Sequence, residues 1–170
     1  MERLQLARLL AAFGKSLLVI IGNIAALSLI AVPALTNARD EKSVPPGTVV
    51  KLWNKIYDAG KSQNPPVAAT TAAAFLYLAW SVHPGSPTTY NLAGLYTAAA
   101  VLTVSIVPYT ILTMRPTNNA LIKLAKSRGE LTSTEVAQSN DLLGRWVVLN
   151  GIRSLLPLLG GVVATTAAYF

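Results

Sequence analysis

Arg153 is the residue whose type and position point most directly to chemistry. It lies eight residues beyond Arg145, about 12 Å along a helix, and apolar residues surround it. A charge inside a membrane span costs roughly 2.5–3.5 kcal/mol on insertion scales, so it usually has a functional or pairing role. The alternative is an arginine whose side chain reaches the membrane surface or binds backbone carbonyls.

The residues around Arg153 suggest what it could bind. Trp146, Asn150, Arg153 and Pro157 follow steps of four, three and four residues, which places them on one helix face. A fixed guanidinium beside aromatic planes suits a flat, phenolic, partly anionic ligand. The hypothesis is therefore a binding or catalytic site built on this face.

The composition indicates which kind of fold must position such a site. Charged residues make up 12% of the 170 residues and hydrophobic residues 52%, whereas soluble domains carry about 25% charged residues. Residues 62–114 contain no Asp, Glu, Lys or Arg at all. These values exclude an ordinary soluble globule, a disordered chain and a free-standing nucleic-acid binder, so no nucleic-acid partner is expected.

The hydrophobic pattern predicts an all-α, integral-membrane four-helix bundle that forms a single membrane domain over residues 1–170. The expected spans are about 16–35, 67–82, 89–114 and 146–168. About 20 residues cross a bilayer core, so the second span is short. Residues 83–87 are rich in turn-forming types and separate the second span from the third. Pro108 should kink the third span.

The two longer loops are each expected to hold a short amphipathic helix. One begins at Thr48 and turns Trp53 and Tyr57 to one face, and the other ends near Gly129. Thr132 with Glu135 then predicts a capping box for a helix that runs into the last span. The longer loops carry most basic residues and should face the cytoplasm, although Arg3, Arg8 and Lys15 favour the opposite orientation.

This topology brings several polar and aromatic side chains to the same side of the membrane as Arg153. The aromatic ones have an alternative role as a belt at the membrane interface. Asn23, in the middle of the first span, either joins helices or contacts a ligand. The expected set is Trp53, Tyr57, Tyr109, Thr110, Asn118, Trp146, Asn150 and Arg153.

Cofactor motifs are missing from the sequence. It contains no cysteine and one histidine, His83, so thiolate metal sites and multi-histidine sites within one chain are excluded. It also lacks the glycine-rich motifs of nucleotide-binding domains. No metal and no cofactor are therefore expected.

The sequence resembles the anthrone oxygenase-like family of small four-span membrane proteins over about residues 16–165. The matching motifs are Val32-Pro33-Ala34-Leu35, Trp53-x-x-x-Tyr57-x-x-Gly60, Pro108-x-Thr110-x-x-x-Met114-x-Pro116-Thr117-Asn118 and Trp146-x-x-x-Asn150-x-x-Arg153. The resemblance implies oxidation of an anthrone-type polyketide to its anthraquinone by molecular oxygen, without a cofactor. It also implies residence in the endoplasmic reticulum membrane.

The implied reaction suggests roles for the candidate residues. Arg153 would bind the enolate or a phenolate oxygen, and Asn150 and Asn118 would donate hydrogen bonds. Trp53 and Trp146 would stack on the rings. The general base is left open among Asp58, Tyr57 and His83.

Two alternatives to an enzyme are compatible with the spans. One is a non-catalytic membrane scaffold or carrier for a hydrophobic metabolite. The other is a transporter, which would need several copies of a four-span chain to form a path. The oligomeric state is left open, with a homo-oligomer among the alternatives.

Overall fold

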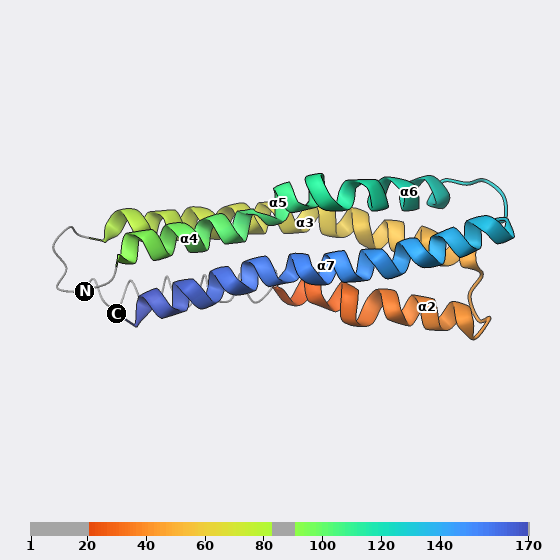
Figure 1. Cartoon of the computed structure of the whole chain (residues 1–170), viewed down its shortest axis with the longest axis horizontal. Coiled ribbons are helices and arrows are strands. Elements are labelled where there is room, and N and C mark those ends of the chain that lie inside the picture. The colour runs from red at the N-terminus through yellow and green to blue at the C-terminus, as the bar shows by residue number, and fades with distance from the viewer. Residues whose placement is uncertain (1–20, 83–90, 170) are drawn as a thin grey trace. The chain divides into compact units, whose positions relative to one another are not determined.

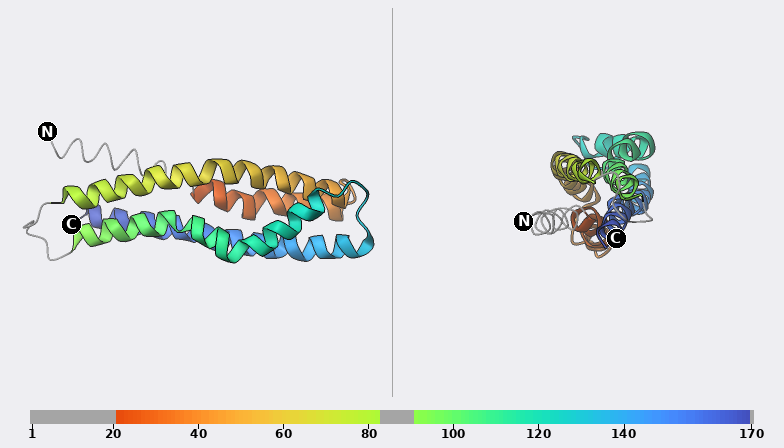
Figure 2. Two further views of the ribbon diagram at one scale, coloured as in Figure 1. Left: turned by 90° about the horizontal axis from the view of Figure 1, so that it is seen from above. Right: turned by 90° about the vertical axis from the view of Figure 1, so that its left-hand side faces the viewer.

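The computed structural model describes residues 21–82 and 91–169, and the regular elements in these ranges are helices joined by short turns (Figure 1; Figure 2 gives the same ribbon from two further sides). Over the described ranges it contains no strand, so the predicted all-α class is confirmed. The elements in chain order are the π-helical turn η1 (Leu27–Ala31), α2 (Val32–Asp40), α3 (Pro46–Ser81), α4 (Leu92–Val104), α5 (Ile106–Tyr109), the π-helical turn η2 (Thr110–Met114), α6 (Arg115–Ala125) and α7 (Ser133–Ala168).

Three helical stretches of the described chain are long and apolar enough to cross a membrane. They are Ile21–Asp40, Leu92–Ala125 and Ser133–Ala168. They contain the described part of the first expected span, residues 92–114 of the third and the whole of the fourth. Residues 89–90, with which the third expected span begins, lie outside the described residues. Residues 16–20, with which the first expected span begins, lie outside the described residues.

The region predicted as a polar loop and a separate amphipathic helix differs from the expectation. The first half of α3 and the second expected span form one continuous helix, Pro46–Ser81, which passes through Pro65 and Pro66. A proline inside a helix removes one backbone hydrogen bond and usually kinks or ends the helix. Here both halves of α3 carry buried side chains, Trp53 in one and Phe75 in the other, and packing of both halves stabilises the helix across the prolines.

The predicted disturbance at Pro108 is present as a break between α4 and α5. Val104 is the last residue of α4, Ser105 is its C-cap, and α5 begins at Ile106. The predicted capping box also forms, because the backbone N–H of Thr132 donates to Glu135 Oε2 at 2.9 Å and the N–H of Glu135 donates to Thr132 Oγ1 at 3.3 Å. The helix that it opens, α7, continues into the last predicted span.

Both π-helical turns end two residues before a proline. In η1 the N–H of Val32 bonds to the carbonyl of Leu27, five residues back, and Pro33 follows. In η2 the last residue is Met114, and Pro116 follows. A proline ring collides with the carbonyl four residues before it, and a wider turn at that point relieves the collision.

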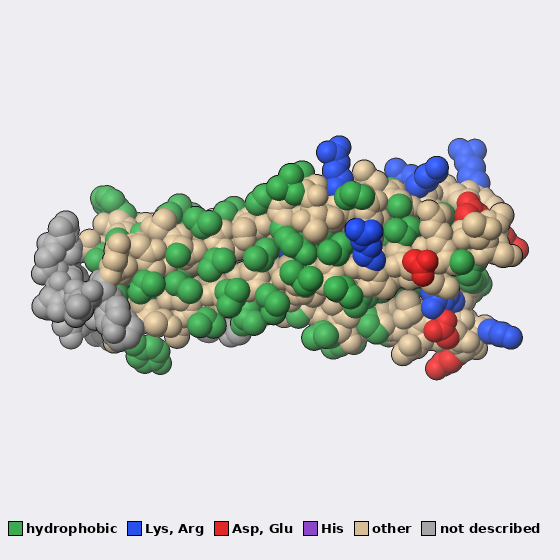
Figure 3. All heavy atoms as spheres, in the orientation of Figure 1, with side chains coloured by type: hydrophobic (Ala, Val, Ile, Leu, Met, Phe, Trp, Pro, Cys, Tyr) green, Lys and Arg blue, Asp and Glu red, His purple; other side chains and the backbone are tan. Residues whose placement is uncertain are grey.

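The chain divides into two compact units. Of the described residues, the first unit holds 21–22, 64–82, 91–107 and 154–169, and the second holds 23–63 and 108–153. The first unit contains no Asp, Glu, Lys or Arg among these residues, so every charged residue of the described chain belongs to the second unit. On the face drawn in Figure 3, the charged side chains gather over α2, α6 and the start of α7.

Small residues pack the core of the first unit. The second half of α3, α4 and the end of α7 meet in a buried cluster of Ala72, Phe75, Leu78, Tyr96, Ala99, Ala100, Ala164 and Ala167. Gly160 of α7 lies against α4 so closely that an added Cβ would stand 2.8 Å from Thr103 Oγ1 and 2.9 Å from the carbonyl oxygen of Ala99. This is the close approach between helices that small residues permit in membrane proteins.

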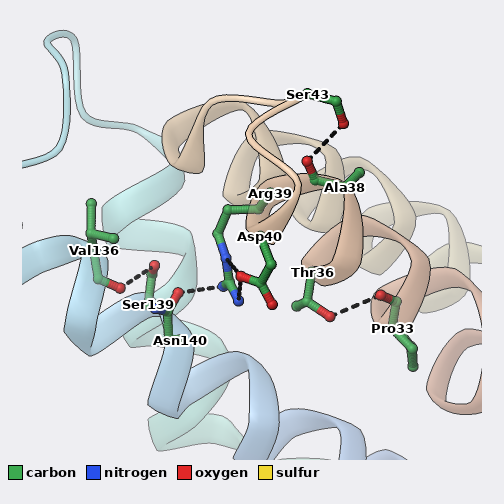
Figure 4. A network of polar contacts seen from close by, with 9 residues as sticks. All are labelled: Pro33, Thr36, Ala38, Arg39, Asp40, Ser43, Val136, Ser139 and Asn140. Atoms are coloured by element: carbon green, nitrogen blue, oxygen red, sulfur yellow. Dashed lines mark hydrogen bonds and ion pairs between the residues drawn. The ribbon is translucent and has the colours of Figure 1, made fainter.

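Four segments of the second unit share its core. The buried members are Val32, Val49, Val50, Trp53, Met114, Leu121, Leu124, Ala125, Leu143 and Trp146. Figure 4 shows how α2 is fixed to α7, because Arg39 donates to Asn140 Oδ1 and pairs with Asp40 at 2.8 Å. The second unit therefore holds together by an apolar core and by a polar clamp between α2 and α7.

The close contact at Gly160 predicts a stability difference between two glycine substitutions in α7. Gly160→Ala should lower the free energy of unfolding by about 1–3 kcal/mol, because its methyl group collides with α4. Gly144→Ala is the control, since nothing lies within 4 Å of its new methyl group, and it should be neutral or slightly stabilising. Unfolding in detergent measures both variants; equal stability of the two would contradict the packing described.

Candidate functional site

A hydrogen-bond network around Asn150 is the most extensive buried polar feature of the second unit. Asn150 is fully buried, and its Nδ2 donates to the carbonyl oxygen of Ile24 at 2.8 Å and to Ser28 Oγ at 2.7 Å. Its Oδ1 accepts from Nη2 of Arg153 at 2.6 Å. Nη1 of Arg153 donates to Thr110 Oγ1 at 3.0 Å. Three chain segments therefore meet at Arg153 and Asn150.

The two π-helical turns supply the hydroxyl groups of this network. Ser28 lies in η1 and Thr110 lies in η2. A π turn contains more residues than an α-turn, so it changes the direction in which the following side chains point. The prolines that favour these turns, Pro33 and Pro116, thereby help to direct Ser28 and Thr110 toward α7. Such turns occur often at functional sites.

Arg153 keeps its charge without a carboxylate partner. Across residues 21–82 and 91–169 the single salt bridge is Arg39–Asp40, and Arg153 bonds only to the neutral groups of Asn150 and Thr110. Its Nε is buried with no hydrogen-bond partner in the described chain. The guanidinium also interacts electrostatically with Tyr57 and Tyr109. The arrangement leaves a fixed positive charge with one free donor.

Aromatic side chains are packed in the core beside this network. The rings of Trp53 and Tyr57 stack with centroids 5.3 Å apart, and Trp53 meets Trp146 in a T-shaped contact at 5.8 Å. Trp53 and Trp146 are fully buried, while Tyr57 is half-buried. Because Trp146 lies one turn before Asn150 on α7, the aromatic cluster and the polar network share that helix face.

The outer surface beside the network is apolar. Exposed large hydrophobic residues stand close in sequence to each hydroxyl or amide of the network: Leu29 and Ile30 after Ser28, Ile111 and Leu112 after Thr110, and Val148 and Ile152 around Asn150. A charged and polar interior beneath an apolar exterior is typical of a membrane-embedded site.

The other predicted site residues lie in different surroundings. Asn118 of α6 is buried, and its Oδ1 has no partner in the described chain. Asp58 is exposed and accepts a hydrogen bond from Asn54 Nδ2 at 3.0 Å. Asn23 is half-buried next to Ile24. His83 lies outside the described residues.

Ser28 is a site residue that sequence reasoning missed. Its side chain is buried and accepts from Asn150, which is 122 positions away in the sequence. One signal was available, because Asn23 and Ser28 are the only side chains between residues 17 and 35 that form strong hydrogen bonds. A polar side chain in an apolar span usually faces another helix.

The fold and the site define a helical protein with stretches long and apolar enough to cross a membrane and with a buried polar network centred on one arginine. The chain belongs to the anthrone oxygenase family, whose model matches residues 53–163, from Trp53 to Val163. The match includes Trp146, Asn150 and Arg153, and it begins after Ser28.

Curated relatives agree with this membership. The chain is 38% identical over 160 residues to anthrone oxygenase encC of Aspergillus fumigatus, covering 88% of this chain and 86% of the relative. It is 34% identical over 138 residues to anthrone oxygenase tpcL of the same species, covering 81% and 78%. The noranthrone monooxygenase of Aspergillus flavus is 34% identical over 140 residues, covering 81% and 62%. No solved structure matches the chain.

The network predicts a large loss of stability when the amide of Asn150 is removed. Asn150→Leu leaves the buried groups of Ile24 and Ser28 and one nitrogen of Arg153 without their partner. Since each such group costs about 1–3 kcal/mol, the free energy of unfolding should fall by about 3 kcal/mol. Asn119→Leu is the matched control, because Asn119 is an exposed helical asparagine.

Detergent unfolding of both variants, followed by circular dichroism, measures this difference. Ser28→Ala removes one of the two acceptors of Asn150. Its free energy of unfolding should fall by about 1 kcal/mol, between the losses of Asn119→Leu and Asn150→Leu. An Asn150→Leu protein as stable as Asn119→Leu would contradict the network.

Proposed function

We propose that this chain is an oxygenase that converts an anthrone-type polyketide to its anthraquinone with molecular oxygen, through a stabilised enolate and without a cofactor. The names of the relatives support the reaction. The observation that carries the site assignment is the guanidinium of Arg153, which has no carboxylate partner. Hydrogen bonds to the neutral side chains of Asn150 and Thr110 hold it, and the surface beside it is apolar.

The proposed reaction balances without any added reductant. An anthrone has an acidic CH₂ between two aromatic rings, and loss of one proton gives an electron-rich enolate. The enolate transfers electrons to oxygen, and a C–O bond forms at that carbon to give a peroxide. Loss of the second C–H proton then breaks the O–O bond, so one oxygen atom remains as the new carbonyl and the other leaves as water.

Arg153 has the central role in this proposal. Negative charge collects on the carbonyl oxygen when the first proton leaves, and a fixed cation in an apolar environment stabilises that charge strongly. Both N–H groups of the Asn150 amide are donated within the protein. We therefore assign Asn150 the task of holding Arg153, with Thr110 on the other side of the guanidinium.

The remaining candidate residues receive roles by their surroundings. Trp53, Trp146 and Tyr109 would line the substrate site, with Asn118 as a further polar contact and Asn23 beside the Ile24 carbonyl. Tyr57 and Asp58 are the candidate proton acceptors. Tyr57 is the better placed, because it stacks on the buried Trp53, whereas Asp58 is exposed and bonded to Asn54.

The absence of a cofactor follows from the substrate's chemistry. An anthrone enolate can itself reduce oxygen, so the protein needs to stabilise the enolate, position oxygen and exclude water. The composition agrees with this proposal, since the chain has no cysteine and one histidine.

The membrane arrangement that we propose has four spans. The second half of α3, Asn64–Ser81, would add the fourth span to the three apolar helices, and the first half of α3 and α6 would be the amphipathic helices of the longer loops. The exposed apolar side chains around the network would let a hydrophobic substrate enter from the bilayer. We place the protein in the endoplasmic reticulum with the longer loops in the cytoplasm.

This orientation predicts which engineered thiols react from the cytoplasmic side. The chain has no cysteine, so Glu130→Cys and Tyr169→Cys each provide one exposed thiol. In sealed microsomes a membrane-impermeant maleimide should label Glu130→Cys and should label Tyr169→Cys only after detergent is added. The reverse pattern would contradict the proposed orientation.

Oxygen consumption by the purified protein distinguishes an enzyme from a carrier. In detergent, the wild-type protein should consume oxygen with emodin anthrone well above the spontaneous rate and form one quinone per oxygen molecule. A carrier would bind the anthrone and leave the rate of oxidation at the background.

The role of Arg153 predicts a graded loss of this activity. Arg153→Ala should lower kcat/KM by roughly 100- to 1,000-fold, as is usual when a donor to a developing oxyanion is removed. Arg153→Lys keeps the positive charge but lacks the planar guanidinium, so its kcat/KM should lie between those of the wild type and Arg153→Ala. Arg145→Ala is the control, because Arg145 is exposed and lies two turns earlier on α7. Its kcat/KM should remain within about twofold of the wild-type value. Unchanged turnover by a folded Arg153→Ala protein would remove Arg153 from the site.

A further inference from the structure

Unpartnered polar atoms are concentrated in the aromatic core of the second unit. The indole Nε1 atoms of Trp53 and Trp146, Nε of Arg153 and Oδ1 of Asn118 are all buried with no hydrogen-bond partner in the described chain. Folded proteins leave few buried polar groups unsatisfied. Each such group costs about 1–3 kcal/mol, so several in one region indicate a ligand that would satisfy them.

These atoms belong to residues that pack in one region. The two indole rings touch, with centroids 5.8 Å apart. Trp146 precedes Arg153 by seven residues on α7, which is about 10 Å along the helix axis. Asn118 lies on α6 between Met114 and Leu121, which both pack in the same buried cluster as the two tryptophans.

The rings themselves are already occupied by other rings. Tyr57 stacks on one face of Trp53, at an interplanar angle of 15°, and Trp53 and Trp146 meet edge to face at 88°. The N–H groups of these tryptophans, in contrast, have no hydrogen-bond partner in the described chain. The chemistry on offer to a ligand is therefore hydrogen bonding, with donors from Trp53, Trp146 and Arg153 and an acceptor from Asn118.

We propose that Trp53, Trp146 and Asn118 determine substrate specificity by binding oxygen substituents on the rings of the substrate, in addition to the oxygen that Arg153 binds. These substituents are the ring oxygens of the anthrone-type substrate that the proposed function assigns to this site. The indole N–H groups donate to hydroxyl or carbonyl oxygens, and Asn118 Oδ1 accepts from a phenolic O–H. This inference rests on the proposed function, because it assigns the substrate of that same site.

The physical consequence is discrimination against substrates that lack these oxygens. A site with buried donors rejects an analogue that cannot pair with them, since the donors stay unsatisfied in the complex. Selectivity of roughly 10- to 100-fold for the hydroxylated substrate follows from the loss of one or two such bonds.

The test compares two substrates on wild-type protein and on Trp146→Phe, which keeps an aromatic ring and removes the N–H group. The substrates are 1,8-dihydroxyanthrone and anthrone, which has no ring hydroxyl. The measured quantity is the ratio of their kcat/KM values, because differences in intrinsic reactivity cancel when the ratio is compared between proteins. Trp80→Phe is the control, since Trp80 is exposed in the first unit.

We expect Trp146→Phe to lower the preference for the dihydroxy substrate about tenfold and Trp80→Phe to leave it unchanged. Asn118→Leu gives an independent variant, with Asn119→Leu as its control, if Trp146→Phe does not fold. An unchanged preference in folded Trp146→Phe and Asn118→Leu proteins, with normal turnover of both substrates, would overturn the specificity proposal alone.

Binding of the quinone products separates the two proposals. Equilibrium binding of 1,8-dihydroxyanthraquinone and of anthraquinone is measured on the same proteins, and the same loss of preference in Trp146→Phe is expected. If no anthrone is turned over but this preference is present and Trp146-dependent, the oxygenase function fails while the hydrogen-bonding site stands. Equal binding of both quinones by wild type would overturn the site itself.

Discussion

An arginine cation without a carboxylate partner, inside an apolar helix, is the constraint on which the second unit depends. Such a charge is costly unless hydrogen bonds hold it. Asn150 Oδ1 accepts a hydrogen bond from Arg153. The two N–H groups of the same amide are also buried and therefore need acceptors on other segments. They find the Ile24 carbonyl and the Ser28 hydroxyl on the first described helix. A single charge thus ties α7 to two other segments of the unit.

The helices are shaped to meet this demand. Pro33 and Pro116 each follow a π-helical turn, and these turns carry the hydroxyls that complete the network. The two π-helical turns interrupt the regular backbone hydrogen bonds of their helices. They lie where side chains of neighbouring segments can bind the backbone groups that are freed. Neutral partners leave the full positive charge of Arg153 available to a substrate anion, which a carboxylate partner would have neutralised. The same network therefore serves stability and the proposed chemistry.

Sequence alone predicted those features that depend on local periodicity. The shared face of Trp146, Asn150 and Arg153 follows from helical spacing, and the capping box at Thr132 follows from a known local pattern. Ser28 was not predicted, because its partner is 122 residues away and its direction depends on a π turn. The continuity of α3 through Pro65 and Pro66 was also not predicted, because packing outweighs the local preference of proline to end a helix.

The amide of Asn150 shows how contacts change an assigned role. The reaction implied by the family resemblance gave it a direct hydrogen bond to the substrate. Its donors are used within the protein, so we propose that it acts on the substrate through Arg153. For Trp53 and Trp146, the stacking on a ligand stays a prediction, and their unpartnered N–H groups support the further proposal that they donate hydrogen bonds.

Stabilisation of an anthrone enolate by Arg153 is the central claim, and it can be observed without oxygen. Mixing the purified protein with an anthrone under anaerobic conditions at neutral pH stops the reaction before oxidation. The account predicts the long-wavelength absorbance of the enolate with wild-type protein, and its loss with Arg153→Ala at the same occupancy. Neutral anthrone bound to both proteins, with no enolate absorbance in either, would contradict the account.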